Sequence, residues 1–283
     1  MSSNLENIDI EDWKLIKETS EEKIYEQSGI EKRIQIFENY TVEENYKNGK
    51  LHGLTIGRMN EPFTHFPENK SKIYLIENYK NGKLNGLQRG YYEDGSKTET
   101  NWLNDQMHGK VVSYFGNGQQ EKERHYIKGK LEGKQMEWYI NGQVKLEEVF
   151  VKGVPSGESL KYLESGYLKR KRYYQKGKIE GLVYELWDYK GNIIDGGIYS
   201  ETEYKNDIPN GKETVYFPNN TKMREGVYKN GIEDGKRIWW NLNGSLAIKE
   251  YYENGELDGE RFLYDEQGKL ESIQKYAHGE RIS

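Results

Sequence analysis

The sequence lacks cysteine, has few prolines and contains no long apolar run. Without cysteine, disulfides, zinc–thiolate sites and cysteine nucleophiles are excluded. Only 5 prolines occur in 283 residues, and no apolar stretch approaches the roughly 18 residues of a transmembrane helix. Hydrophobic residues make up 34% of the chain and the mean hydropathy is −1.04, so a deep aliphatic core is not expected.

Charge of one sign is also scarce, except near the N-terminus. The formal net charge is −5, and residues 1–45 alone hold 12 acidic and 5 basic side chains. The remainder carries a net charge of +2 and offers no basic field for nucleic acid or anionic lipid. The N-terminus MSSNLENIDIEDW is acidic and has no apolar signal core, so we expect a cytoplasmic protein.

Tyrosine and glycine are abundant, with 24 and 31 residues, and the glycines follow a repeat of about 24 residues. Phrases such as ENYKNGKLNG, YYQKGKIEG and YYENGELDG recur along the chain. The second glycine of each phrase is Gly53, Gly86, Gly109, Gly133, Gly157, Gly181, Gly211, Gly235 or Gly259. Two longer intervals mark insertions at 54–72 and 188–201.

Each repeat contains two turns, and an aromatic ring precedes each turn, so the rings form two sets along the chain. A second turn residue follows nine or ten positions later, which leaves segments of roughly six to eight residues, the length of a strand. The rings before the first turn are Tyr46, Tyr79, Trp102, Tyr126, Phe150, Tyr174, Tyr204, Tyr228, Tyr252 and Tyr276. The rings before the second are Tyr91, Tyr114, Trp138, Tyr162, Trp187, Tyr216, Trp240 and Tyr264. We expect both sets to stack into one aromatic spine.

The pattern predicts an all-β fold: an elongated, twisted antiparallel sheet of about nine to ten stacked β-hairpins over residues 43–283. Residues 1–42 are predicted to be an acidic N-terminal cap or degenerate hairpin region, with a short helix at 11–23. The alternative for this region is an acidic arm that binds a partner. The insertions 54–72 and 188–201 are expected to be loops, which either bind a partner or are neutral.

The Tyr-x-x-Gly-x-x-x-Gly pattern, followed by an aromatic residue and Asn/Asp-Gly, resembles the MORN (membrane occupation and recognition nexus) repeat. It is most similar to the variant found in bacterial YwqK-type antitoxins. The resemblance covers residues 43–283 and departs from the pattern at Asp105, Asp207 and Asn220. It implies a hairpin-repeat scaffold, linked in bacterial proteins to neutralising a toxin and in eukaryotic ones to scaffolding, dimerisation and lipid contact.

No pattern in the sequence predicts an enzyme, a metal site or a cofactor. His52 and His108 lie at equivalent turn positions two repeats apart, too far to share one ion. No pair of carboxylates is marked out for acid–base chemistry, and no Walker or Rossmann glycine spacing is present. The basic run Lys169 to Arg172 precedes two tyrosines, but alternation along a strand would divide it between two faces, so direct nucleic-acid binding is not expected.

Aromatic residues outside the spine are the candidate partner-binding residues. By alternation, we expect the face opposite the spine to display Tyr92, Phe115, Tyr139, Tyr173, Phe217, Trp239 and Tyr251. Phe63 and Phe66 in the first insertion are further candidates. We predict a non-catalytic protein that binds and occludes a partner; the resemblance implies that the partner is an enzyme or toxin, such as a nuclease, and that the chain acts as an antitoxin or immunity protein. The alternative is a scaffold or membrane-surface organiser that does not insert into the membrane.

Overall fold

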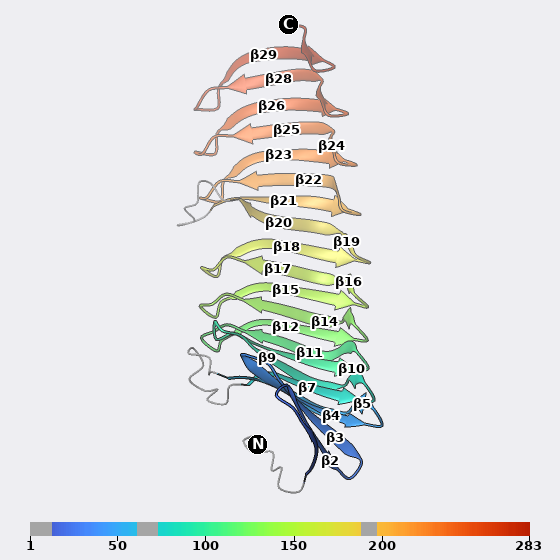
Figure 1. Cartoon of the computed structure of the whole chain (residues 1–283). Coiled ribbons are helices and arrows are strands. Elements are labelled where there is room, and N and C mark those ends of the chain that lie inside the picture. The colour runs from blue at the N-terminus through green and yellow to red at the C-terminus, as the bar shows by residue number, and fades with distance from the viewer. Residues whose placement is uncertain (1–12, 61–72, 188–196) are drawn as a thin grey trace. The chain divides into compact units, whose positions relative to one another are not determined.

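The computed structural model describes residues 13–60, 73–187 and 197–283, and these residues form strands and turns without a helix. The chain divides into two compact units, Met1–Gln143 and Val144–Ser283, and each is described by itself. Within each unit, strands pair antiparallel with their neighbours in chain order and the sheet is open (Figure 1). The predicted all-β fold of antiparallel hairpins is confirmed. Among the described residues there is no helix with the length and hydropathy needed to cross a membrane.

Unit 1 consists of long strands with two-residue strands between some of them. The long strands are β1 (Lys14–Glu18), β2 (Glu22–Gln27), β3 (Ile30–Ile36), β4 (Tyr40–Lys47), β6 (Gly53–Met59), β7 (Ile73–Lys80), β9 (Gly86–Tyr91), β10 (Lys97–Leu103), β11 (Gln106–Tyr114), β12 (Gln120–Ile127) and β14 (Gly133–Trp138). The two-residue strands are β5 (Lys50–Leu51), β8 (Lys83–Leu84) and β13 (Lys130–Leu131).

Unit 2 follows the same plan, and its two-residue strands lie along one side of the sheet (Figure 1). The long strands are β15 (Val144–Val151), β17 (Gly157–Tyr162), β18 (Leu168–Gln175), β20 (Gly181–Trp187), β21 (Ile198–Lys205), β22 (Ile208–Tyr216), β23 (Lys222–Lys229), β25 (Gly235–Trp240), β26 (Leu246–Glu253), β28 (Gly259–Tyr264) and β29 (Leu270–Ala277). The two-residue strands are β16 (Val154–Pro155), β19 (Lys178–Ile179), β24 (Ile232–Glu233), β27 (Glu256–Leu257) and β30 (Glu280–Arg281).

The helix predicted at 11–23 is wrong for the residues that are described. Lys14–Glu18 forms strand β1, which pairs with β2 from Lys14 opposite Glu26 to Glu18 opposite Lys23. The Thr19 hydroxyl accepts the backbone N–H of Glu22 at 3.0 Å and thereby fixes the turn between the two strands. A helix this short gains little by itself in water, so pairing with the neighbouring strand determines the structure.

A two-residue left-handed turn begins each repeat and holds it against the repeat before. In the β23–β24 turn, Asn230 and Gly231 have φ of 52° and 84°, the conformation of a type I′ turn, which suits Asn-Gly. The N–H of Gly231 donates to the carbonyl of Pro209, 2.8 Å away, in the preceding repeat. The N–H of Asn230 donates to Asn210 Oδ1 at 3.0 Å. Both turn amides are therefore satisfied by the neighbouring hairpin.

The side chain that accepts the N–H of the first turn residue comes from the residue just before the second glycine of the preceding repeat. Asn210 holds this position in one repeat, and His52 and His108 hold it in two others. His52 Nδ1 lies 3.5 Å from the N of Asn81, and His108 Nδ1 lies 3.4 Å from the N of Lys128. In another repeat Asp258 Oδ2 accepts the N–H of His278 at 3.1 Å. These histidines therefore connect one repeat to the next.

Asp105 and Asp207 replace the turn glycine and compensate for their left-handed conformation with a side-chain bond. Asp105 has φ of 66° and its N–H donates to the Leu84 carbonyl at 3.0 Å, as a glycine in this turn does. Its Oδ1 in addition accepts the N–H of Leu84 at 2.7 Å. Asp207, with φ of 70°, makes the same two bonds to Ile179. The departures from the repeat pattern thus preserve the contact between repeats.

The rings that precede the first turn and the rings that precede the second turn lie on opposite faces of the sheet. The prediction that both sets stack into one aromatic spine is therefore wrong. Tyr228 is opposite Gly211, whereas Tyr216 lies five residues further along β22, an odd number, and so points to the other face. We call the side bearing Tyr228 face A and the side bearing Tyr216 face B, and use the same names for the equivalent sides of every repeat. Trp187 also differs from prediction, because it pairs with Ile198 on face A.

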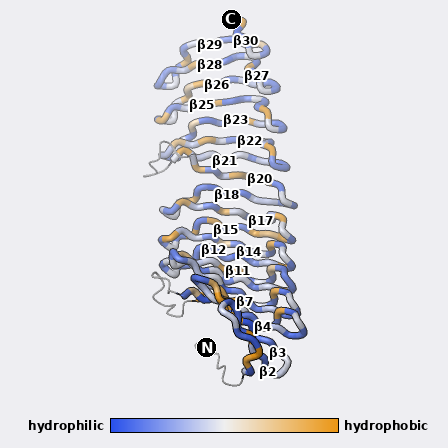
Figure 2. Tube along the Cα trace, in the orientation of Figure 1, coloured by the Kyte–Doolittle hydropathy of each residue, from blue (hydrophilic) through white to orange (hydrophobic). Residues whose placement is uncertain are grey.

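Burial is shared between the two faces. Face A holds buried polar residues near its middle, such as Ser200 and Glu250, while Val112 and Leu186 are buried on face B. Hydrophobic residues occur in short stretches along the strands instead of one continuous layer (Figure 2). In this single sheet, side chains are buried by their neighbours on the same face. No second layer of the described residues covers either face.

Burial changes the acidity of the rings on face A. The pKa of Tyr79 rises to about 12, mainly because the hydroxyl is removed from water and also because it donates to Glu77 at 2.9 Å. Burial raises the pKa of Tyr46 to about 12 in the same way, with Glu44 as the hydrogen-bond partner. The rings are thus held in partly dry positions although they belong to one sheet.

We predict that Asp105→Ala lowers the free energy of unfolding by about 1 kcal/mol, because the bond to Leu84 is lost while the left-handed backbone remains. Asp105→Gly should lose less, since glycine adopts this φ without strain. The measurement is urea unfolding of the full chain followed by circular dichroism. Equal midpoints for the alanine and glycine variants would contradict the account of this turn.

We also predict that stability falls as pH rises from 10 to 12. An unfolded tyrosine ionises near pH 10.0, whereas Tyr79 keeps its proton to about 12, so unfolding releases protons in this window. Tyr79→Phe should flatten the dependence, as measured by urea midpoints across the window. The control is Tyr173→Phe, since the ring of Tyr173 is 52% exposed. A Tyr79→Phe profile as steep as that of the unsubstituted protein would refute the prediction.

Candidate functional site

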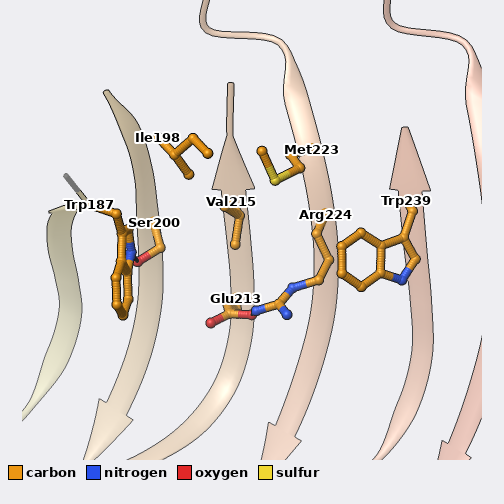
Figure 3. Close-up of a pocket in the computed structure, with 8 residues that line it drawn as sticks. All are labelled: Trp187, Ile198, Ser200, Glu213, Val215, Met223, Arg224 and Trp239. Atoms are coloured by element: carbon orange, nitrogen blue, oxygen red, sulfur yellow. Dashed lines mark hydrogen bonds and ion pairs between the residues drawn. The ribbon is translucent and has the colours of Figure 1, made fainter. Parts of the chain in front are cut away.

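A groove of about 260 Å³ lies on face A of unit 2 (Figure 3). Strands β20, β21, β22, β23 and β25 form it, and its lining residues are Trp187, Ile198, Ser200, Glu213, Val215, Met223, Arg224 and Trp239. Trp187 and Trp239 stand at its two ends, with the Glu213–Arg224 pair between them (Figure 3). The groove is therefore an apolar slot with indole walls and one ion pair.

Strand pairing places part of the lining in one straight line across four strands. Ser200 is opposite Val215, Val215 is opposite Arg224, and Arg224 is opposite Trp239. Directly opposed residues project to the same side of a sheet with their Cβ atoms about 5 Å apart. The walls and floor of the groove are thus fixed by the pairing of the backbone rather than by a loop.

Both indoles are oriented by their N–H groups. Trp187 Nε1 donates to Ser200 Oγ at 3.2 Å, and Trp239 Nε1 donates to Glu250 Oε1 at 3.1 Å. Trp187 is nevertheless 55% exposed, and Ser200 beside it is buried. The polar edge of each indole is engaged, so the apolar part of the ring is what remains for contact.

The ion pair at the centre of the groove is stacked against one wall. Arg224 Nη2 forms a salt bridge with Glu213, and the two side chains are 23% and 14% exposed. The guanidinium of Arg224 lies 5.3 Å from the centroid of the Trp239 ring, and that of Arg237 lies 5.9 Å from it. These contacts hold Trp239 in place and use its electron-rich face.

The surroundings of the groove are partly dry. Burial is the main cause that raises the pKa of Tyr204 and of Tyr228, which are on the same face of β21 and β23. The Glu213 carboxylate also raises the pKa of Tyr228 through its negative charge.

Met223 enters the groove because β23 carries a bulge. The register passes from Val215 opposite Arg224 to Tyr216 opposite Lys222, which leaves Met223 as the extra residue. Other long strands have the same bulge with a different residue in it. These residues are Glu121, Lys169, Ala247 and Glu271. The large apolar side chain at 223 is therefore particular to the groove and not needed for the bulge.

Trp239 likewise departs from the repeat. It is the fourth residue after Gly235, the second glycine of its repeat, and this position is held in five other repeats by Gly90, Ser113, Glu137, Lys161 and Glu185 and in two by the smaller apolar residues Val215 and Leu263. The fold thus tolerates small and charged residues where the wall of the groove stands. Large apolar side chains have been placed at two positions that the hairpin does not require to be apolar.

The predicted partner-binding residues do not share one face. Tyr92 is on face A, where its hydroxyl lies 3.4 Å from Thr98 Oγ1, and Trp239 is on face A in the groove. Phe115, Tyr139 and Phe217 begin second turns and follow face B residues, which places them toward face A. Tyr173 and Tyr251 are on face B, opposite Glu158 and Lys236. The expectation of one row opposite the spine is therefore wrong.

Other predicted features are placed as follows. Phe63 and Phe66 lie outside the described residues, and so do residues 61–72 and 188–196 of the two insertions. Leu54 to Met59 belong to β6, and Ile198 to Glu201 belong to β21. The run from Lys169 to Arg172 is divided, since Lys171 pairs with Glu158 on face B and Arg172 with Glu185 on face A.

Sequence reasoning found Trp239 but missed its partners in the groove. Trp187 was assigned to the spine because the insertion after it shifts the spacing to the second turn. Val215 and Met223 carry no motif of their own. The available signal is the comparison of equivalent positions between repeats, in which Met223 replaces the Glu, Lys or Ala of other repeats.

The groove has no arrangement for catalysis. Its carboxylate and guanidinium are paired with each other, and its serine accepts from an indole. Among the described residues, no group of three or more His, Asp or Glu side chains could hold a metal ion. What the arrangement offers is a shaped apolar surface with fixed walls.

Comparison with known proteins identifies the repeat in part of the chain. Residues 209–230, 233–254 and 257–278 match the family of the MORN repeat variant. These stretches are in unit 2 and include Val215, Met223 and Trp239 of the groove, whereas Trp187 lies before them. The predicted MORN-type repeat is supported there; repeats of this family are interaction modules and not typically catalytic. No curated protein matches the chain.

We predict that Glu213→Gln lowers the free energy of unfolding by about 1–3 kcal/mol, because Arg224 would keep its charge in a partly dry site without a counter-ion. The control is Glu158→Gln, whose partner Lys171 and own side chain are 50% and 46% exposed. This change should stay within about 0.5 kcal/mol. Both are measured by urea unfolding; similar losses for the two variants would show that the central pair is not special.

Proposed function

We propose that this chain is a non-catalytic protein-binding repeat protein that inhibits a partner enzyme or toxin by covering its active surface. The observation that carries the proposal is the groove of unit 2, in which Met223 stands where the equivalent bulges hold small or charged residues and two indoles form the ends. Tryptophan and arginine are enriched among the residues that dominate protein interfaces. Both are present in the groove and fixed in position.

A protein partner suits the groove better than a small ligand does. Pockets for drug-sized molecules usually enclose about 300–1,000 Å³, and this groove encloses about 260 Å³. It is also built on the broad face of a rigid sheet, which supplies surface on all sides for further contact. A preformed surface of this kind loses little conformational entropy on binding.

An antitoxin-like role is the specific form of the proposal. The MORN repeat variant supports an interaction module, and the acidic residues 1–45 would complement a basic partner such as a nuclease. Such a protein would act in the cytoplasm beside its target. Inhibition would be steric, because the chain brings no catalytic group to the complex.

The test is affinity purification of a partner with the tagged full chain at low and high salt, followed by an assay of the partner's activity. We expect one enzyme or toxin in near-stoichiometric amount, and loss of its activity when the purified chain is added back. Recovery of a partner that stays fully active would remove the inhibitory part. If only envelope or lipid components are recovered, the membrane-surface organiser would replace the proposal.

A further inference from the structure

We infer that the groove of unit 2 is an anchor slot for one large apolar side chain, such as leucine, methionine or phenylalanine, carried by a segment of the partner protein. The inference rests on the proposed function and specifies what the partner presents at this site. It differs from recognition by charge, which the acidic N-terminal region would provide.

The contact surface of the slot is apolar. Ile198, Val215 and Met223 contribute aliphatic or thioether groups, and Trp187 and Trp239 form the two ends. A methionine in the floor adapts to different apolar shapes, and an indole wall offers a broad flat contact. With about 260 Å³ of space, the slot has room for one or two side chains and not for a folded element.

The polar groups of the slot have partners already, except Arg224 Nε, which is buried without a hydrogen-bond partner. Arg224 is paired with Glu213, the Trp187 N–H donates to Ser200, and the Trp239 N–H donates to Glu250. Because the one donor without a partner, Arg224 Nε, is itself buried, a polar or charged occupant would give up its own water without reaching a free partner, which is unfavourable. An apolar occupant gives up only unfavourable hydration.

The charge around the slot is balanced. Face A of unit 2 carries four arginine–glutamate pairs, which join Arg172 to Glu185, Arg224 to Glu213, Arg237 to Glu233 and Arg261 to Glu250. Each of these four arginines has a carboxylate beside it, so the pairs around the slot set up no net field that selects an acidic or a basic partner. Binding at the slot is expected to depend little on salt.

Other repeats of the chain show which substitution in the slot the fold should tolerate. Met223→Glu introduces the residue that the same bulge holds at Glu121 and Glu271, so the hairpin should accept it. Trp187→Gln removes one wall from a side chain that is 55% exposed. The matched control is Leu182→Gln, which removes an apolar side chain of 54% exposure from face B of β20, the strand that carries Trp187.

The probe is a library of random 12-residue peptides displayed on phage and selected against the full chain. Enriched peptides are then synthesised, and their affinity is measured by fluorescence polarisation at low and high salt. We expect the enriched peptides to share one Leu, Met or Phe, whose replacement by Ala weakens binding about tenfold or more. Met223→Glu and Trp187→Gln should weaken binding to a similar extent, and Leu182→Gln should leave it unchanged. Circular dichroism and urea midpoints confirm that each variant is folded.

The results separate this inference from the proposed function. No enrichment, peptides selected for charge, or affinity unchanged by Met223→Glu and Trp187→Gln in folded protein would each overturn the slot. If a partner from affinity purification is still bound and inhibited by those variants, the proposed function stands and the slot falls. Peptides that bind as expected, in a protein that inhibits no partner, would support the slot while refuting inhibition.

Discussion

The left-handed two-residue turn is the constraint on which the rest of the structure depends. The second amide of the turn donates to a backbone carbonyl of the preceding hairpin, and in several repeats the first amide donates to a side chain there, as Asn230 does to Asn210. A turn of ordinary hand would splay the strands and leave these amides without partners. The rule is strong enough that Asp105 and Asp207, which lack the freedom of glycine, keep both the conformation and the bond.

Because the sheet has no covering layer among the described residues, its stability comes from neighbours within each face. Tyrosine rings, carboxylates and guanidinium groups bury one another, and the raised pKa values of the rings report how far water is excluded. A surface built in this way is mostly polar and charge-balanced. It can become a binding site where a few larger apolar side chains replace the usual residues, as Met223 and Trp239 do.

The fold was predictable from sequence, whereas the site was predictable only in fragments. The spacing of glycines and rings fixes hairpins because turn conformation and side-chain alternation are local properties. The prediction that both ring sets share one face is wrong because it rests on the spacing of each ring to its turn. Strand pairing shows that a ring of one set is opposite a residue five positions from the ring of the other set, as Tyr228 is opposite Gly211 and Tyr216 follows five residues later, and an odd spacing puts the two rings on opposite faces. The short helix at 11–23 failed because strand pairing is not a local property. The groove depends on residues from five strands, of which the sequence marks only Trp239 as a binding candidate and places Trp187 in the spine.

The turn-to-turn contact also determines how disturbances spread. Each hairpin is held by the one before it and the one after it, so the array behaves as a chain of nearest-neighbour links, in which opening can start at an end and advance one unit at a time. The strands that form the groove have β15–β18 on one side and β26–β29 on the other within unit 2. Opening from the last hairpin would have to separate β29, β28 and β26 before it reached the strands of the groove. Amide protons in β22 and β23 should therefore exchange more slowly than those in β29.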